Sequence, residues 1–166
     1  ETQHHQKAHI QSLSRLDRNQ HLWMDAFTLK SLELFYALHP GGHSLLSVID
    51  LTQTPMGART LRHWIARPLT QTEAIAKRHD TVAFFNEQKL LRQSMRDELK
   101  SINDLERLSM RIATRRIGPK ELKGLEKTLQ HCLNIESKLV QTPIALAVKT
   151  AAVDEVKTTI SSTLNE

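Results

Sequence analysis

The sequence predicts an all-α protein: a multi-helix domain that follows a short extended N-terminal segment. Three observations lead to this class. Apolar residues recur at three- and four-residue steps along most of the chain after residue 24. Residues that cap helix starts, including two threonine-proline pairs, precede several of these runs. Proline and glycine separate one run from the next, as expected where helices end.

The N-terminal part is predicted to contain an extended segment and two helices. Residues 9–24 carry apolar side chains without a helical stripe, which favours a short strand or an extended entry. The run Asp25–Leu38 is expected to be an apolar helix that Asp25 caps and that residues 40–42, Pro-Gly-Gly, end. Ser44 is expected to cap a second short helix through Leu51, apolar on several sides and therefore buried.

The next two helices are marked by their starts. Thr54 and Pro55 supply an N-cap followed by proline at the first helical position, where the missing N–H costs nothing. Pro68 should end that helix. Thr70 and Glu73 have the spacing of a capping box, and the predicted helix continues through Phe85.

The C-terminal half is predicted to be helical throughout. Apolar steps give one helix over residues 90–102, and Asn103 with Glu106 forms a second capping-box pair. Gly118 suits the left-handed position after a helix end, and Pro119 opens a long amphipathic helix of roughly five to six turns. Thr142 and Pro143 repeat the cap signal, before one or two further helices that reach Leu164.

Composition limits the class of protein further. The 166 residues suit one compact domain, and the low glycine and proline content argues against disorder. A net charge of +5 favours acidic partners, nucleic acid first among them. No apolar run reaches the roughly 18 residues of a membrane helix, so we expect a soluble, cytoplasmic protein. Because the chain opens with Glu1 instead of methionine, we expect it to be part of a longer protein.

The run from Met24 to Leu69 resembles the opening of the core domain in the MutS family of mismatch-repair proteins. Its most specific pieces are Leu32-Glu33-Leu34, Ser44-Leu45-Leu46 with Asp50, Thr54-Pro55-Met56-Gly57-Ala58-Arg59, and Trp64 with Pro68-Leu69. The likeness continues more loosely through residues 102–107 and 118–122. It therefore covers nearly the whole chain.

The resemblance implies a domain assignment and a parent protein. Residues 1–23 would be the C-terminal end of the connector domain, and residues 24–166 the first part of the core/lever domain, before the clamp. The intact parent would be an ATPase that uses ATP and Mg²⁺ and recognises mismatched double-stranded DNA. It would form a homodimer and work with a MutL-type partner.

The segment itself is expected not to be an enzyme and to hold no cofactor or metal. It lacks the G-x-x-x-x-G-K sequence, followed by serine or threonine, that cradles phosphates. His5 and His9 stand four residues apart without a third metal ligand at a suitable spacing. His63, His79 and His131 fall in predicted helices without a nucleophile nearby in sequence, so packing or surface roles are favoured.

Other side chains have a structural interpretation and a sharper alternative. Cys132 is expected to be a small buried apolar residue, with a reactive thiol as the alternative. Arg59 and Arg62 are expected to pair with acidic groups, with phosphate contact as the alternative. The aromatic residues on apolar stripes are predicted to be core residues: Phe27, Phe35 and Trp64.

The most basic stretch supplies candidate DNA contacts. Arg107, Arg111 and Arg115 repeat every four residues and should line one helix face, which could lie against phosphates. A solvated or domain-contacting face is the alternative. The full candidate set is Arg107, Arg111, Arg115, Arg116, Lys120 and Lys123.

The hypothesis that the sequence favours is a structural scaffold of packed helices that carries rigid-body displacement between the ATPase end and the DNA-gripping clamp of the parent. The alternative is an autonomous helical nucleic-acid-binding module. The positive net charge supports it, but the sequence lacks a recognisable recognition helix. An enzyme in its own right comes last.

Overall fold

The computed structural model describes residues 20–140, 142–144 and 150–164, and this part of the chain contains eight helices and no sheet. The predicted all-α class is confirmed. In chain order the helices are α1 (Ala26–Ser31), α2 (Leu45–Ile49), α3 (Pro55–Ala66), α4 (Thr72–Glu87), α5 (Lys89–Lys100), α6 (Leu105–Ala113), α7 (Pro119–Leu139) and α8 (Thr150–Leu164).

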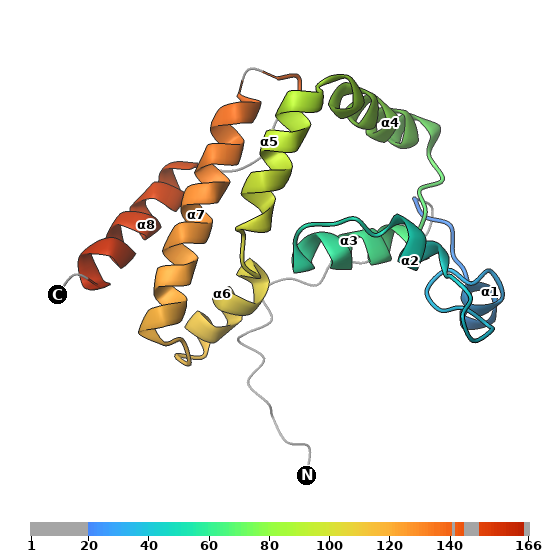
Figure 1. Ribbon diagram of the computed structural model, residues 1–166, viewed down its shortest axis with the longest axis horizontal. Helices are drawn as coiled ribbons and strands as arrows, with labels where there is room; N and C mark the ends of the chain where they lie inside the picture. The colour runs from blue at the N-terminus through green and yellow to red at the C-terminus, as the bar shows by residue number, and fades with distance from the viewer. Residues whose placement is uncertain (1–19, 141, 145–149, 165–166) are drawn as a thin grey trace, which may run out of the picture.

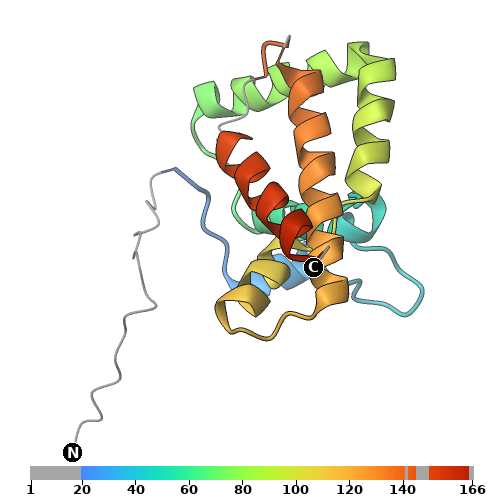
Figure 2. The same ribbon diagram turned by 90° about the vertical axis from the view of Figure 1, so that its left-hand side faces the viewer.

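Helix α7 is the centre of the arrangement. It lies between α5 and α8 in both views, and α6 lies beside its N-terminal end (Figures 1 and 2). Helix α4 leads into α5 at the other end of the bundle, while α1 and α2 lie farthest from α8 (Figure 1). The 21 residues of α7 confirm the predicted length of that helix.

The apolar core lies where α5 meets α7. Ile102, Ile135 and Leu139 are its buried members. Ile135 and Leu139 belong to α7, whose buried residues stand three, seven and four positions apart and therefore lie on one side of the helix. Side chains from α3, α4, α5 and α7 pack around them: Met56, Phe85, Met95, Leu99 and Cys132. Burial also raises the pKa of the Cys132 thiol, which supports packing over reactivity for this residue.

The extended N-terminal segment is seen over residues 20–22. His21 and Leu69 form an antiparallel bridge, in which the Leu22 N–H donates to the Pro68 carbonyl at 2.8 Å. The Thr70 N–H donates to the Gln20 carbonyl at 3.1 Å. The remainder of the segment predicted over residues 9–24, up to residue 19, lies outside the described residues.

Three of the predicted caps are present as expected. The Asp25 carboxylate accepts the Thr28 N–H at 2.7 Å, the Ser44 hydroxyl accepts the Ser47 N–H at 3.1 Å, and the Thr54 hydroxyl accepts the Gly57 N–H at 3.0 Å. Pro55 and Pro119 occupy first-turn positions of α3 and α7. Helix α3 ends before Pro68, as predicted.

The helix predicted over Asp25–Leu38 is wrong in its length, because α1 ends at Ser31. The chain turns at Glu33, whose φ of 50° is left-handed. The Glu33 carboxylate then accepts the Leu38 N–H at 2.7 Å. The carbonyl oxygens of Glu33 and Leu34 accept N–H groups from Leu45 and Leu46, at 3.0 and 2.9 Å. These contacts with the start of α2 replace a further turn of helix.

The prediction that the second helix is buried is also wrong in this chain. Only Ser44, at its N-cap, is buried, whereas Val48 is 64% exposed and Leu51 is 69% exposed. No described element covers this apolar side of α2.

Several predicted boundary residues have other positions. Helix α4 begins at Thr72, and its N-cap is Gln71 instead of Thr70. The N-cap of α6 is Asp104, one residue after the predicted Asn103. Gly118 has a φ of −96° and is the N-cap of α7. The left-handed residue after α6 is instead Arg115, with a φ of 55°.

The C-terminal prediction is met in part. Helix α8 confirms a helix ending at Leu164. Residues 142–144 are not helical, so the Thr142-Pro143 pair does not open a helix there. Within the described ranges, no helix is both long enough and apolar enough to cross a membrane.

Candidate functional site

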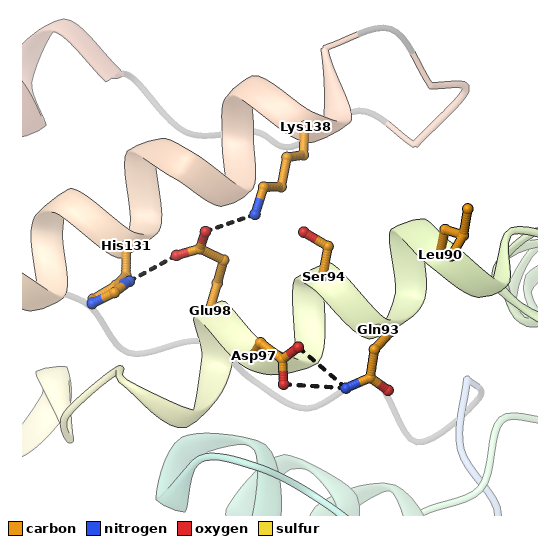
Figure 3. A pocket seen from close by; sticks show the side chains of 7 residues that line it. All are labelled: Leu90, Gln93, Ser94, Asp97, Glu98, His131 and Lys138. Carbon is orange, nitrogen blue, oxygen red and sulfur yellow. Dashed lines mark hydrogen bonds and ion pairs between the residues drawn. The ribbon is translucent and has the colours of Figure 1, made fainter.

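The candidate site consists of three sets of polar contacts that fix the helices against one another. The first set centres on Glu98 of α5, whose carboxylate faces α7 (Figure 3). One oxygen lies 2.7 Å from His131 Nδ1 and accepts the Asn134 amide at 3.2 Å, and the other accepts Lys138 Nζ at 2.6 Å. The Glu98 side chain is only 16% exposed. Four polar groups therefore meet at the α5–α7 contact.

These contacts set the charge state of Glu98. Hydrogen bonds from His131, then Lys138, then Asn134 lower the pKa of the carboxyl from 4.5 to about 2, against the opposing effect of burial. The carboxylate is therefore ionised at neutral pH. The three α7 residues stand at spacings of three and four, which places them on one side of that helix.

The second set fixes the loop between α5 and α6 to α7. Thr128 is fully buried, and its hydroxyl accepts both the Asn103 N–H, at 3.2 Å, and the Asn103 side-chain amide, at 3.0 Å. The same hydroxyl donates to the Gly124 carbonyl at 2.9 Å, and the Asn103 amide donates to that carbonyl at 3.2 Å. One buried hydroxyl thus satisfies the backbone where the chain leaves α5.

The third set joins α3 to the start of α6. The Arg59 guanidinium donates to both Asp104 oxygens, at 2.9 and 2.8 Å, and also to Glu106. The Arg59 contact, with a smaller contribution from the Arg107 N–H, lowers the pKa of Asp104 from 3.8 to about 2. The predicted ion pair of Arg59 is confirmed. It connects residues 45 positions apart in sequence.

Among the described residues, Arg62 has no acidic partner of the kind predicted for it. Its guanidinium lies 4.4 Å from the centre of the Phe35 ring and 5.5 Å from that of Tyr36, and it donates to the Tyr36 hydroxyl at 3.1 Å. The contact ties α3 to the turn that follows α1.

Two of the three aromatic residues predicted to be core residues are exposed. Phe27 is 77% exposed, and Trp64 is 46% exposed with the Arg78 guanidinium 3.8 Å from its ring centre. Phe35 is half-buried beneath Arg62. The apolar periodicity correctly placed Phe27 and Trp64 in helices, but both side chains are exposed in the described part of the chain.

The histidines do not form a catalytic arrangement among the described residues. His131 faces Glu98, and His63 lies 3.3 Å from an Arg67 nitrogen. His79 lies at an open hollow beside Phe85. His5 and His9 lie outside the described residues. In the described ranges, no three histidine, cysteine, aspartate or glutamate side chains are grouped so that they could hold a metal ion.

The structure divides the six candidate DNA contacts. Arg107 reaches Asp104 at 3.4 Å, and Arg111 pairs with Glu121 of α7. Arg115 is not on the same helical face, because α6 ends at Ala113. Within the described ranges the other three cations have no ion-pair partner: Arg116, Lys120 and Lys123. The predicted stripe is therefore broken after two residues.

Sequence reasoning missed the Glu98 contact. The available signal was the polar triplet His131, Asn134 and Lys138, which recurs at helical spacing beside the apolar stripe of α7. Nothing in that spacing identifies Glu98 as the partner, because the partner depends on how α5 packs.

The described residues thus form an all-α unit whose helices are joined by these three sets of contacts. The family model for MutS domain III matches residues 27–166. The chain belongs to the MutS family.

Relatives named DNA mismatch repair protein MutS support this assignment. The one from Flavobacterium psychrophilum is 38% identical over 143 residues, 86% of this chain and 16% of the relative. The one from Cytophaga hutchinsonii is 40% identical over 85% of this chain and 16% of the relative. The one from Porphyromonas gingivalis is 47% identical over 78% of this chain and 14% of the relative. The chain thus spans about a sixth of the length of these relatives.

Proposed function

We propose that this chain is a structural scaffold of a mismatch-repair protein, which links an ATPase end to a DNA-gripping clamp. The observation that carries the proposal is the set of polar contacts that fixes α5 and α6 around α7 and α3 to α6. Close-packed helices joined in this way resist bending, so that a displacement at one end reaches the other.

The finer domain assignment is part of the proposal. Residues 1–23 would end the connector domain, and residues 24–166 would be the first part of the core/lever domain, before the clamp. The family match supports a second domain that starts near residue 24, because the match begins at residue 27, close to the start of α1.

The parent protein is proposed to be a cytoplasmic ATPase that binds mismatched double-stranded DNA, forms a homodimer and works with a MutL-type partner. The names of the relatives support the repair role. ATP and Mg²⁺ would be held elsewhere in the parent. This segment lacks the phosphate-binding loop sequence, so its residues supply no catalytic step and it is proposed not to be an enzyme.

Exposed apolar side chains support a place within a larger protein. Large apolar residues on α1 and α2, in the segment between them and just after α2 face solvent in this chain, with exposures from 42% to 77%: Phe27, Leu32, Tyr36, Leu38, Leu45, Val48, Ile49 and Leu51. A surface this apolar is typical of an interaction face.

The test breaks a scaffold contact in the intact parent. We expect Arg59→Gln to leave ATP turnover without DNA unchanged, because the segment that carries Arg59 lacks the phosphate-binding loop sequence. We expect it to reduce severalfold the change in turnover that mismatched duplex causes, because α3 is released from α6. Both rates are measured by phosphate release.

The matched control is Lys77→Gln, which removes one positive charge from the exposed surface of α4. If Arg59→Gln keeps the full response to mismatched duplex while amide exchange shows that α3 is released from α6, the transmitting role is wrong.

The second candidate function is an autonomous nucleic-acid-binding module, favoured by the cations at the start of α7 that have no ion-pair partner among the described residues. It requires the isolated chain to bind DNA with a dissociation constant of about 10⁻⁸ M or tighter at physiological salt. Gel-shift titration over a range of salt concentrations separates this function from a scaffold role.

A further inference from the structure

The turn between α6 and α7 and the first three turns of α7 expose five basic side chains, which we call the basic face: Arg115, Arg116, Lys120, Lys123 and Lys127. All five residues are exposed, and none has an ion-pair or side-chain hydrogen-bond partner in the described part of the chain. Arg107 and Arg111, which precede them, are excluded because carboxylates already pair with them.

The carboxylates in this stretch face elsewhere. The two oxygens of Glu121 contact Arg111 and the Gly118 N–H. The Glu126 carboxylate accepts the Ser161 hydroxyl of α8 at 2.6 Å. Neither acid therefore neutralises the basic face, and its positive charge is presented to solvent.

Helical spacing places the three lysines of the basic face on one side of α7. Lys120, Lys123 and Lys127 stand at spacings of three and four on α7, away from the side that buries Leu125 and Thr128. They extend over about 10 Å of helix axis. The N-terminal end of α7 adds the positive pole of its helix dipole at the same place.

Arg115 is held in a backbone conformation that favours glycine. Its φ is 55°, and the turn is closed by the Arg115 N–H on the Ile112 carbonyl at 2.9 Å and the Arg116 N–H on the Arg111 carbonyl at 2.8 Å. A non-glycine residue in this conformation costs roughly 1 kcal/mol. This turn places the exposed Arg115 beside the exposed Arg116 directly after α6.

The residue types in and around the basic face indicate which class of partner it binds. Residues 114–127 contain no phenylalanine, tyrosine or tryptophan. Protein interfaces are enriched in aromatic anchors and depleted of lysine at their centres. Base recognition in single strands uses aromatic stacking. A surface of lysine and arginine without aromatic residues suits the phosphates of duplex DNA, which proteins contact independently of sequence.

We propose that the basic face is a contact surface for the phosphate backbone of duplex DNA, which binds without regard to sequence or mismatch. The contact does not depend on the scaffold role, because it needs only the folded α6–α7 turn. In the isolated chain its dissociation constant is expected to be about 10⁻⁴ to 10⁻⁶ M at physiological salt, the range of non-specific DNA binding.

The experiment measures fluorescence anisotropy of a short labelled duplex with the full 166-residue chain, from about 50 to 200 mM salt. The test variant carries Lys120→Gln, Lys123→Gln and Lys127→Gln. The control carries Lys30→Gln, Lys77→Gln and Lys89→Gln, which removes the same charge from exposed positions on α1, α4 and α5. Circular dichroism shows whether each variant keeps its helices.

We expect the test variant to lose at least about tenfold in affinity and its salt slope to fall by roughly 2 to 3, at about 0.9 per phosphate lost. The control should bind as the unmodified chain does, and mismatched duplex should bind as paired duplex does. Equal losses in both variants would attribute binding to net charge and overturn the proposal. Absence of binding at the lowest salt, or tighter binding to polyglutamate than to DNA, would also overturn it.

Discussion

Glu98 shows how one residue can hold two helices together. It contributes a single carboxylate, but that group accepts from His131, Asn134 and Lys138 across the α5–α7 contact. Hydrogen bonds to a partly buried charged group stabilise a fold more than those to a neutral exposed one. The contact is also sensitive to pH, because its strength depends on the ionised form.

We predict that Glu98→Gln lowers the free energy of unfolding by about 1 kcal/mol at neutral pH. The folded-state pKa of Glu98 is about 2, below the ordinary 4.5. The contribution is therefore complete above pH 4.5 and is lost as the pH falls toward 2. Urea unfolding of both chains across this range measures the difference.

The matched control is Glu155→Gln on the exposed side of α8. A difference between Glu98→Gln and the unmodified chain that stayed constant down to pH 2 would contradict the assignment of this effect to the carboxylate.

Thr128 stabilises the fold through its hydroxyl. This buried group accepts from Asn103 and donates to the Gly124 carbonyl. We predict that Thr128→Val, which keeps the shape, lowers the free energy of unfolding by about 1 to 3 kcal/mol, because the Asn103 N–H is left without its partner. Thermal unfolding and urea titration measure the loss.

The control for Thr128→Val is Thr158→Val on α8. The Thr158 hydroxyl also donates to the carbonyl four residues earlier, at 2.8 Å, but the residue is exposed. If both substitutions cost the same, the bond to Asn103 contributes nothing measurable.

At the scale of elements, helix boundaries depend on which backbone groups find partners. Helix α1 stops after six residues because the carbonyls beyond it accept from the start of α2. Helix α6 ends at Ala113, and the left-handed residue that follows it is Arg115 instead of the predicted Gly118. The turn after α1 is therefore stabilised by a neighbouring element, whereas the turn after α6 is closed by the Arg115 and Arg116 N–H groups on carbonyls of α6 itself.

We predict that Arg115→Gly raises the free energy of unfolding by roughly 0.5 to 1 kcal/mol, because glycine adopts the left-handed conformation without strain. Arg116→Gly is the comparison, since that residue does not have a positive φ and should gain nothing. Denaturant titration of both variants checks the prediction, and equal effects would argue against strain at Arg115.

At the scale of the whole molecule, burial is uneven. Among the described residues, the buried apolar side chains lie in α7 and at Ile102 beside it, whereas α1 and α2 contain none. Segments with few buried apolar contacts open more easily than the core around them. The molecule is therefore expected to have a stable bundle and a weakly held N-terminal part.

We predict that amide hydrogen exchange is slowest in α7 between Leu125 and Leu139 and faster by orders of magnitude in α1 and α2. Mass spectrometry after timed exchange measures it. Uniform protection along the chain would mean that the N-terminal helices are as stable as the bundle.

The sequence by itself determined the class of the fold and most helix starts. Capping by Asp25, Ser44 and Thr54 involves residues three positions apart, so these local contacts could be predicted without knowing the fold. The resemblance over Met24–Leu69 also led to the family that residues 27–166 match.

Only the tertiary structure decided which side chains meet across helices. Glu98 finds His131 33 residues away, and Arg59 finds Asp104 45 residues away. Helical periodicity tells which face a residue occupies but not which element covers that face. For the same reason, the apolar periodicity predicted a buried α2 although Val48 is exposed. Burial and pairing are properties of the packed chain, and periodicity is a property of one helix.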